Sequence, residues 1–153
     1  MNLNKKIAII LVDDDPLILD VLRINVERSV ENNAEVICAS SGPEALELIQ
    51  ELITENEYYI GVILSDFLMP KMLGSEFLLK ADSLLPHSKK IMLTGQAEAE
   101  KIINLLCEME MFRFITKPWN PQTLITQVKK ALDEFVYLKT LELNQNPIRA
   151  NAN

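Results

Sequence analysis

Four apolar segments of the sequence are each followed at once by side chains that could bind a metal ion or a phosphate group. Carboxylates gathered in one place repel one another unless a cation neutralises them, and an all-oxygen set of ligands selects a hard ion such as Mg²⁺. A lysine ammonium and a threonine hydroxyl suit the oxygens of a phosphoryl group. The segments end in Asp13, Asp14 and Asp15; in Asp66; in Thr94; and in Lys117.

Asp66 is the candidate nucleophile of this set, because it stands alone at the end of a segment in the middle of the chain. In-line phosphoryl transfer mainly requires alignment and neutralisation of charge on the equatorial oxygens, so a carboxylate beside a bound cation can attack phosphorus. The pattern predicts phosphoryl transfer onto Asp66 in an acidic, magnesium-binding pocket.

Five short apolar segments have the length and the β-branched content of strands buried on both faces of a parallel sheet. These are Ile7 to Val12, Glu35 to Ala39, Ile60 to Leu64, Lys90 to Leu93 and Phe112 to Ile115.

Segments with helical periodicity lie between these strands and after the last one. In the first helix we expect Asp15 to be the N-cap and Pro16 to occupy the first turn. Its apolar stripe is predicted at Leu17, Val21 and Ile24, widened by Leu22 and Val26. The other helices are expected after the cap residue Ser41, over Gly74 to Leu85, over Ala97 to Glu108, and from Asn120 and Pro121 to at least Leu141.

The alternation of strands and helices predicts an α/β fold, a parallel sheet with helices on both faces and right-handed crossovers. In such folds ligands bind outside the carboxyl ends of the strands, near the point where successive loops diverge to opposite faces. The polar residues that follow the strands should therefore meet at one edge of the sheet.

Composition narrows the class of protein further. The chain has 153 residues with a net charge of -7, which disfavours direct binding of nucleic acid because that needs clustered Lys and Arg. Cys38 and Cys107 lack the spacing of a redox or zinc motif, and we interpret both as reduced core thiols. No secretory signal or membrane-spanning run is evident, so we expect a soluble, cytoplasmic protein without membrane contact.

Four segments carry a family resemblance: IAIILVDDDPLILD, VILSDFLMPKMLG, IMLTGQA and FRFITKPWNP. In this order and at these separations they resemble the receiver domain of bacterial response regulators, from about Lys6 to Leu138. The resemblance implies a flavodoxin-like, doubly wound sheet of five parallel strands in the order 2-1-3-4-5, with five helices, the last extended. One departure is Leu73 before Gly74, where the family often has aspartate, and it changes no reacting group.

The resemblance also implies roles for the acidic residues. A partner histidine kinase, or a phosphotransfer protein, would phosphorylate Asp66. Asp13, Asp14 and Asp66 would hold Mg²⁺ together with the backbone carbonyl of Leu68. The chemistry would be confined to the protein itself, as phosphoryl uptake and autodephosphorylation, so the chain would be a signalling protein and not an enzyme.

A conformational switch is a further implication of the resemblance. Thr94 would turn toward the phosphoryl group, Lys117 would pair with its charge, and the rotamer of Phe114 would follow Thr94. Phosphorylation would then reshape the face formed by the fourth helix, the fifth strand and the fifth helix, where such domains usually dimerise or meet partners. Taken alone, Phe114 could equally be a core residue.

Two other classes of protein remain open. Asp13 and Asp15 fit the Asp-x-Asp of a phosphatase of the haloacid dehalogenase type, with Thr94 and Lys117 as its later residues. That scheme needs another acidic pair at a strand end, which the sequence does not supply after Lys117, and it gives Asp66 no role. A degenerate receiver acting only as a scaffold is the other class, and the presence of every expected site residue disfavours it.

The end of the chain allows two interpretations. Apolar residues three and four apart predict either a coiled-coil seam for a homodimer, or one helix packed on the sheet by its first half. We expect a receiver domain over residues 1–143, its last helix extending past the core from about residue 138, and a polar tail or linker stub over residues 144–153. The spaced residues are Leu124, Val128, Ala131, Phe135, Leu138 and Leu141.

Overall fold

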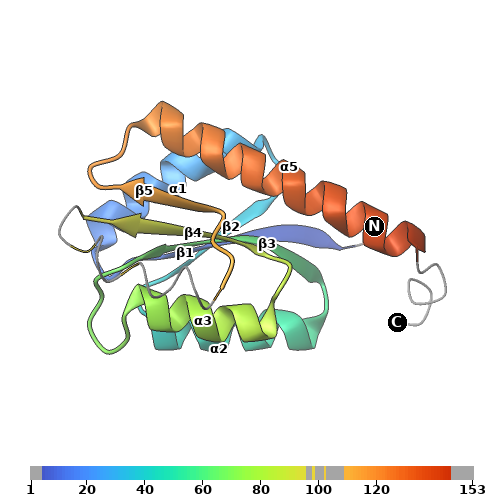
Figure 1. Ribbon diagram of the computed structural model, residues 1–153, viewed down its shortest axis with the longest axis horizontal. Coiled ribbons are helices and arrows are strands. Elements are labelled where there is room, and N and C mark those ends of the chain that lie inside the picture. Colours follow the sequence, from blue (N-terminus) through green and yellow to red (C-terminus); the bar gives the residue numbers. More distant parts are fainter. Residues whose placement is uncertain (1–4, 96–97, 99–101, 103–108, 146–153) are drawn as a thin grey trace.

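A parallel sheet forms the centre of the molecule in the computed structural model, which describes residues 5–95, 98, 102 and 109–145. The strands run in the order β2-β1-β3-β4-β5 (Figure 1), so the predicted topology is confirmed. Each strand lies within a residue or two of its predicted segment: β1 (Lys6–Val12), β2 (Glu35–Ala39), β3 (Tyr58–Asp66), β4 (Lys89–Thr94) and β5 (Arg113–Thr116).

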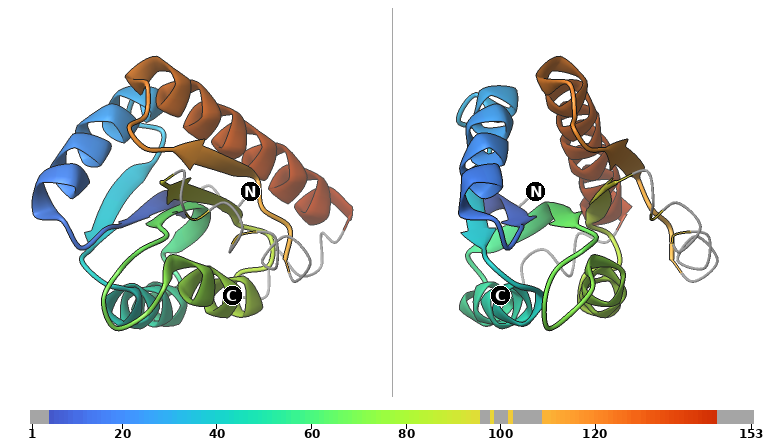
Figure 2. Two further views of the ribbon diagram at one scale, coloured as in Figure 1. Left: turned by 60° about the vertical axis from the view of Figure 1, so that its left-hand side comes forward. Right: turned by 90° about the vertical axis from the view of Figure 1, so that its left-hand side faces the viewer.

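Helices cover both faces of this sheet, as Figures 1 and 2 show. One face carries α1 (Pro16–Val30) and α5 (Pro121–Gln145), and the other carries α2 (Gly42–Glu55) and α3 (Gly74–Leu84). The helix predicted over residues 97–108 falls almost wholly outside the described residues. Within the described part of the chain, no helix is both long and apolar enough to cross a membrane.

The predicted caps fix where α1 and α2 begin. Asp15 accepts hydrogen bonds from the backbone N–H groups of Leu17, at 2.9 Å, and Ile18. Ser41 accepts one from the N–H of Glu44, which satisfies a donor that the first helical turn would otherwise leave unpaired. The Asp15 side chain is therefore the N-cap of α1, as expected.

The buried face of α1 differs from the predicted stripe. Leu17, Val21 and Ile24 are exposed, by 75%, 51% and 51%, whereas Leu22 and Val26 are buried. Apolar residues occur on several sides of this helix, so periodicity alone could not select the inner side. The side that faces inward also carries Asn25, Ser29 and Val30, and the Ser29 hydroxyl is satisfied by donating to the Val26 carbonyl at 2.6 Å.

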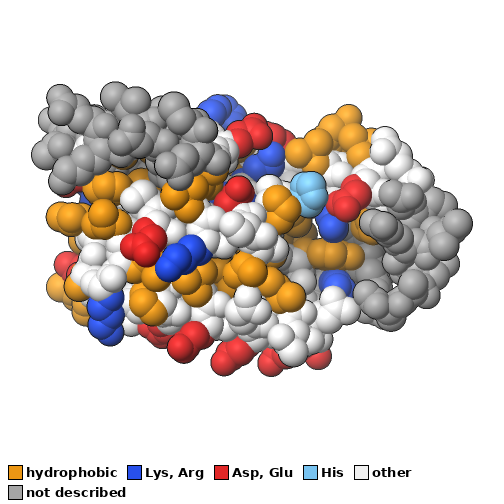
Figure 3. Space-filling view, turned by 60° about the horizontal axis from the view of Figure 1, so that its bottom comes forward, with side chains coloured by type: hydrophobic (Ala, Val, Ile, Leu, Met, Phe, Trp, Pro, Cys, Tyr) orange, Lys and Arg blue, Asp and Glu red, His pale blue; other side chains and the backbone are white. Residues whose placement is uncertain are grey.

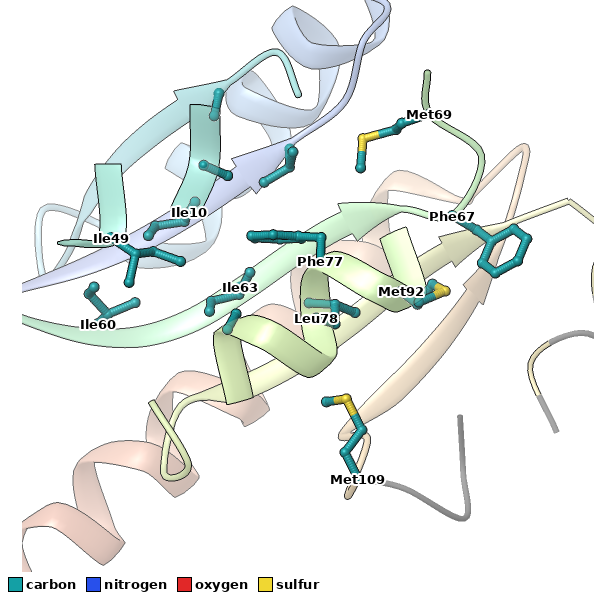
Figure 4. Close-up of a cluster of buried hydrophobic side chains, with 14 of the residues drawn as sticks. Ile10, Ile49, Ile60, Ile63, Phe67, Met69, Phe77, Leu78, Met92 and Met109 are labelled. Atoms are coloured by element: carbon teal, nitrogen blue, oxygen red, sulfur yellow. The ribbon is translucent and has the colours of Figure 1, made fainter. Parts of the chain in front are cut away.

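The sheet divides the core into two apolar clusters. The cluster under α2 and α3 includes Ile10, Ile49, Ile63, Phe77 and Leu78 (Figure 4), all fully buried. The other cluster lies between the sheet and the helices α1 and α5, and includes Leu11, Leu22, Val62, Leu64 and Val128. Strands β1 and β3 contribute to both clusters, which explains why their sequences are apolar without alternation.

A bulge at Gly61 interrupts the pairing of β3 with β1. Ala8 pairs with Ile60 and Ile9 pairs with Val62, so Gly61 is an extra residue. Side chains of β3 change faces at this point: Ile60 and Ile63, three residues apart, share one cluster, and Val62 lies in the other. A Cβ at Gly61 would come within 3.1 Å of the Phe135 ring, so the glycine also lets α5 approach the sheet.

The buried side chains of α5 lie between Leu124 and Phe135. Leu124, Val128, Ala131 and Phe135 are buried in the protein's own core, so most of the predicted coiled-coil seam is already used. The predicted length of the last helix is confirmed, since α5 runs from Pro121 to Gln145. Its exposed apolar side chains are Tyr137, Leu138 and Leu141.

Candidate metal centre at the carboxyl edge of the sheet

Three carboxylates meet where β1 and β3 end. Val12 pairs with Ser65 in the sheet, so the next residues, Asp13 and Asp66, stand at the same height. Asp13 is 1% exposed and Asp66 is 7% exposed, while Asp14 lies at the surface. Each of the three offers a carboxylate oxygen within 4.8 Å of the others, as the sequence predicted.

Lys117 reaches this cluster from the end of β5. Its Nζ lies 2.8 Å from Asp66 Oδ1 and 3.3 Å from Asp13 Oδ2. The lysine backbone N–H donates to the carbonyl of Thr94 at 2.8 Å, which fixes the chain just before the loop. The Lys117–Pro118 peptide bond is cis. The ammonium therefore bridges carboxylates that come from two different strands.

Burial and charge act in opposite directions on the two central groups. Burial raises the pKa of Asp66, the hydrogen bond and charge of Lys117 lower it, and the nearby Asp13 carboxylate raises it, with a net increase. Burial lowers the pKa of Lys117, but its contacts with Asp66 and Asp13 outweigh that effect and raise it. The site thus holds more negative charge than one ammonium neutralises.

This donor set fits a hard divalent cation. Three carboxylates lie within 4.8 Å of one another, with Lys117 as their neighbouring cation. All-oxygen ligands of this kind are those that Mg²⁺ takes in proteins. Asp15 is not a member, because its side chain caps α1; its N–H instead donates to Asp13 Oδ1 at 2.9 Å. The Asp13 and Asp15 pair needed by the phosphatase alternative is therefore not formed here, since the two side chains serve different structures.

The predicted switch residues lie on the strands β4 and β5. Thr94 ends β4, and its hydroxyl donates to the carbonyl of Gly95 at 3.0 Å. Phe114 lies on β5, is half-buried, and packs against the core cluster under α2 and α3. Leu68, whose carbonyl was a predicted ligand, follows Asp66 by two residues and has a side chain that is 59% exposed. Trp119 packs against the other core cluster.

Two residues near Asp66 received no role from the sequence. The buried Ser65 hydroxyl donates to the Asp66 carbonyl oxygen at 2.9 Å, and Gly74 lies in contact with the same carbonyl. A serine directly before the acidic residue, inside an otherwise apolar strand, was the available signal for the first. Nothing in the sequence alone shows the close backbone approach of the second.

Comparison with known proteins places these features in a family. The model of the response regulator receiver domain matches residues 9–129. The hydrogenase transcriptional regulatory protein HoxA of Bradyrhizobium diazoefficiens is 30% identical over 145 residues, which are 95% of this chain and 28% of that protein. The regulatory protein PhoP of Bacillus subtilis is 33% identical over 131 residues, covering 85% of this chain and 49% of PhoP. The chain thus spans between about a quarter and a half of these two relatives.

Solved structures agree with this placement. A receiver domain protein from Clostridium thermocellum superposes with a TM-score of 0.73 at 29% identity, covering 86% of this chain and 98% of that one. A CheY-like receiver from Methanospirillum hungatei gives 0.71 at 34% identity, covering 87% and 98%. The matches favour a receiver over the phosphatase alternative. The chain belongs to the response regulator receiver domain family, signalling domains that are phosphorylated on an aspartate by a kinase.

Proposed function

We propose that Asp66 is the aspartate that accepts the phosphoryl group, from a histidine kinase or a phosphotransfer protein. The observation that carries this proposal is the meeting of Asp13, Asp14 and Asp66 within 4.8 Å, with Lys117 Nζ 2.8 Å from Asp66. In the transfer an Asp66 carboxylate oxygen bonds to phosphorus, the phosphorus–nitrogen bond of the donor phosphohistidine breaks, and an acyl phosphate forms on Asp66.

We propose that Asp13, Asp14 and Asp66, with the backbone carbonyl of Leu68, hold Mg²⁺. When bound, the ion supplies positive charge that offsets the carboxylates and the phosphoryl oxygens. The three carboxylates are the described group that offers such a site. Asp13 and Asp66 are buried and Asp14 is exposed, so Asp14 lies on the side from which a donor arrives.

Lys117 and Thr94 complete the site in this proposal. The Lys117 ammonium lies between Asp66 and Asp13 and can pair with a phosphoryl oxygen without leaving the cluster. The Thr94 hydroxyl donates to the carbonyl of the next residue, a contact that a rotation about its side chain exchanges for the phosphoryl group. Phe114 then changes rotamer and carries the signal to the face that contains β5. Hydrolysis of the acyl phosphate on the same protein resets the switch.

The partner surfaces follow from exposure and charge. We propose that a kinase docks beside the site along the exposed apolar side chains of α1, Leu17 and Val21, and that a second copy of the chain associates through the last turns of α5 or the face containing β5. Nucleic acid is not a direct partner in this proposal, since the net charge is -7 and α2 exposes a row of acidic residues on the side viewed in Figure 3. The domain would act in the cytoplasm, where kinases meet ATP.

Phosphorylation with a small-molecule donor tests the acceptor directly. Incubated with acetyl phosphate and Mg²⁺, the protein should gain one phosphoryl group by mass, and the modified peptide should contain Asp66. Asp66→Asn should gain none, and chelation of Mg²⁺ should prevent the gain in the wild type. Asp133→Asn, an exposed change on α5, is the matched control and should behave as the wild type. A phosphoryl group on Asp66→Asn at the wild-type rate would refute the assignment.

A further inference from the structure

Two neighbouring residues contact the backbone carbonyl of Asp66. The fully buried Ser65 hydroxyl donates to the Asp66 carbonyl oxygen at 2.9 Å. Gly74 lies against the same carbonyl: a Cβ built there would be 1.9 Å from the Asp66 carbonyl oxygen, and 2.9 Å from both the Asp66 carbonyl carbon and the Cα of Phe67. All three are backbone atoms, so no side-chain rotation could make room.

Backbone hydrogen bonds hold the loop between Asp66 and Gly74 to itself and to β4. The N–H of Gly74 donates to the carbonyl of Phe67 at 2.7 Å, and the N–H of Phe67 donates to the carbonyl of Leu93 at 2.9 Å. Gly74 does not have a positive φ, so its lack of a side chain serves close approach and not an unusual backbone conformation. The first turn of α3 is thus packed directly on the residue that ends β3.

We propose that Gly74 and Ser65 are positioning residues for phosphoryl transfer: together they fix the Asp66 backbone, and with it the direction of the acceptor carboxylate. This inference rests on the proposed function and adds two residues to it. Alignment of the attacking oxygen matters because a misplacement of about 1 Å can slow a reaction by about 100-fold.

A side chain at position 74 would have to move one of two elements. Contacts to a Cβ essentially never fall below 3.0 Å, so the gap must open by about 1 Å. Helix α3 resists this movement through the fully buried Phe77 and Leu78. Asp66 is the last residue of β3 and leads directly into the loop, so at least part of the displacement should fall on the acceptor.

Two variants and one control test the proposal. With acetyl phosphate and Mg²⁺, Gly74→Ala should be phosphorylated roughly 10- to 100-fold more slowly than the wild type, at a temperature where circular dichroism shows both to be folded. Ser65→Ala, which creates no steric overlap, should be slowed severalfold. Gly42→Ala is the matched control: it too lies in the first turn of a helix, but its Cβ would meet the flexible Met72 side chain, with Sδ at 2.8 Å, and its rate should be unchanged.

Amide NMR spectra separate positioning from a general loss of structure. In both variants the displaced resonances should include Asp66 to Leu68, with those of β1 unchanged. Wild-type phosphorylation rates in both variants, or shifts confined to α3 in Gly74→Ala, would overturn the proposal. If Gly74→Ala does not fold, Ser65→Ala decides by the same two measurements. If the wild type itself accepts no phosphoryl group, the proposed function fails, while the spectra still report whether Ser65 and Gly74 hold the Asp66 backbone.

Discussion

Lys117 bridges two carboxylates that are both largely buried. Asp13 and Asp66 side chains are 1% and 9% exposed, whereas Lys117 is 23% exposed. Removing the ammonium leaves the two carboxylates together in a largely buried site without a positive charge between them. We expect Lys117→Ala to lower the free energy of unfolding by about 2–3 kcal/mol, toward the low end for a broken buried ion pair because the lysine is partly solvated.

Urea unfolding in the presence of a chelator measures this loss. Mg²⁺ should restore part of the stability of Lys117→Ala, because an ion that binds only the folded protein stabilises it. Lys130→Ala, an exposed lysine on α5, should change little in either condition. An equal loss with and without Mg²⁺ would contradict a shared cation site.

At the scale of single residues the sequence predicted the groups at strand ends. Asp13, Asp66 and Lys117 each follow a buried strand, and parallel strands bring their carboxyl ends to one edge, so type and position were sufficient. Ser65 and Gly74 could not be assigned in this way. Their importance depends on a contact with one backbone carbonyl, which only the packing of α3 on β3 creates.

Among the elements, α1 exposes an apolar surface beside the site. Leu17 and Val21 are 75% and 51% exposed, and Leu17 is separated from Asp14 by only two residues. We expect Leu17→Glu with Val21→Glu to slow transfer from a histidine kinase at least about tenfold, the size expected for lost contacts near the centre of an interface. Phosphorylation by acetyl phosphate should keep its normal rate.

Radiolabelled transfer from the phosphorylated kinase checks this prediction. Tyr137→Glu, which changes a similarly exposed side chain on α5 (63%), is the control and should leave kinase transfer intact. Equal slowing with both donors would mean that the α1 changes disturb the site itself and not a docking surface.

The connection between α3 and β4 contains a buried lysine. Lys90 is 1% exposed; its Nζ lies 2.6 Å from Asp82 Oδ1 and donates to the Leu85 carbonyl at 2.5 Å. Burial lowers the pKa of Lys90, against the opposing effect of Asp82. The folded chain therefore holds this proton less tightly than the unfolded chain, and the contribution of Lys90 to stability rises with pH between the lowered pKa and the ordinary lysine value of about 10.4.

Asp82→Asn should show a loss of stability that depends on pH. Near neutral pH the buried Lys90 ammonium would lose its anionic partner, and we expect a loss of about 2–3 kcal/mol. The loss should shrink as the pH approaches 10, because the neutral amine no longer needs the carboxylate. Urea midpoints across this range measure it. Glu76→Gln breaks the exposed pair with Lys80 on the same helix and should cost less than about 0.5 kcal/mol; a loss in Asp82→Asn that does not vary with pH would contradict the account.

Element types and order followed from the sequence, but the orientation of α1 did not. Buried strands and their alternation with helices predicted the topology, and cap residues such as Asp15 and Ser41 marked helix starts. The inner side of α1 was decided by tertiary packing, because that helix has apolar residues on more than one side. Burial of Ser29 there depends on a local hydrogen bond that no periodicity reveals.

For the whole molecule, the end of α5 offers a short surface for self-association. Tyr137, Leu138 and Leu141 are 63%, 47% and 38% exposed, while Leu124, Val128, Ala131, Leu132 and Phe135 earlier in the helix are buried. If two copies associate there, Leu138→Glu with Leu141→Glu should convert a dimer into a monomer in sedimentation velocity, without changing acetyl phosphate uptake. Ile53→Glu, at an exposed position on α2 (41%), is the control. A dimer that survives the α5 changes would direct attention to the β5 face.

The bulge at Gly61 means that the number of residues in β3, and not only their apolar character, determines which face of the sheet each side chain occupies. Because the strand changes faces there, deleting this one glycine would move the side chains either before it or after it to the opposite face of the sheet. Those side chains would remain buried, but each would meet the helices that pack on the other face. Homologous strands that differ by one residue at this point could not be aligned by hydrophobicity, since both registers are apolar throughout. Only the position of Asp66 at the end of β3, level with Asp13 at the end of β1, would show which register is correct.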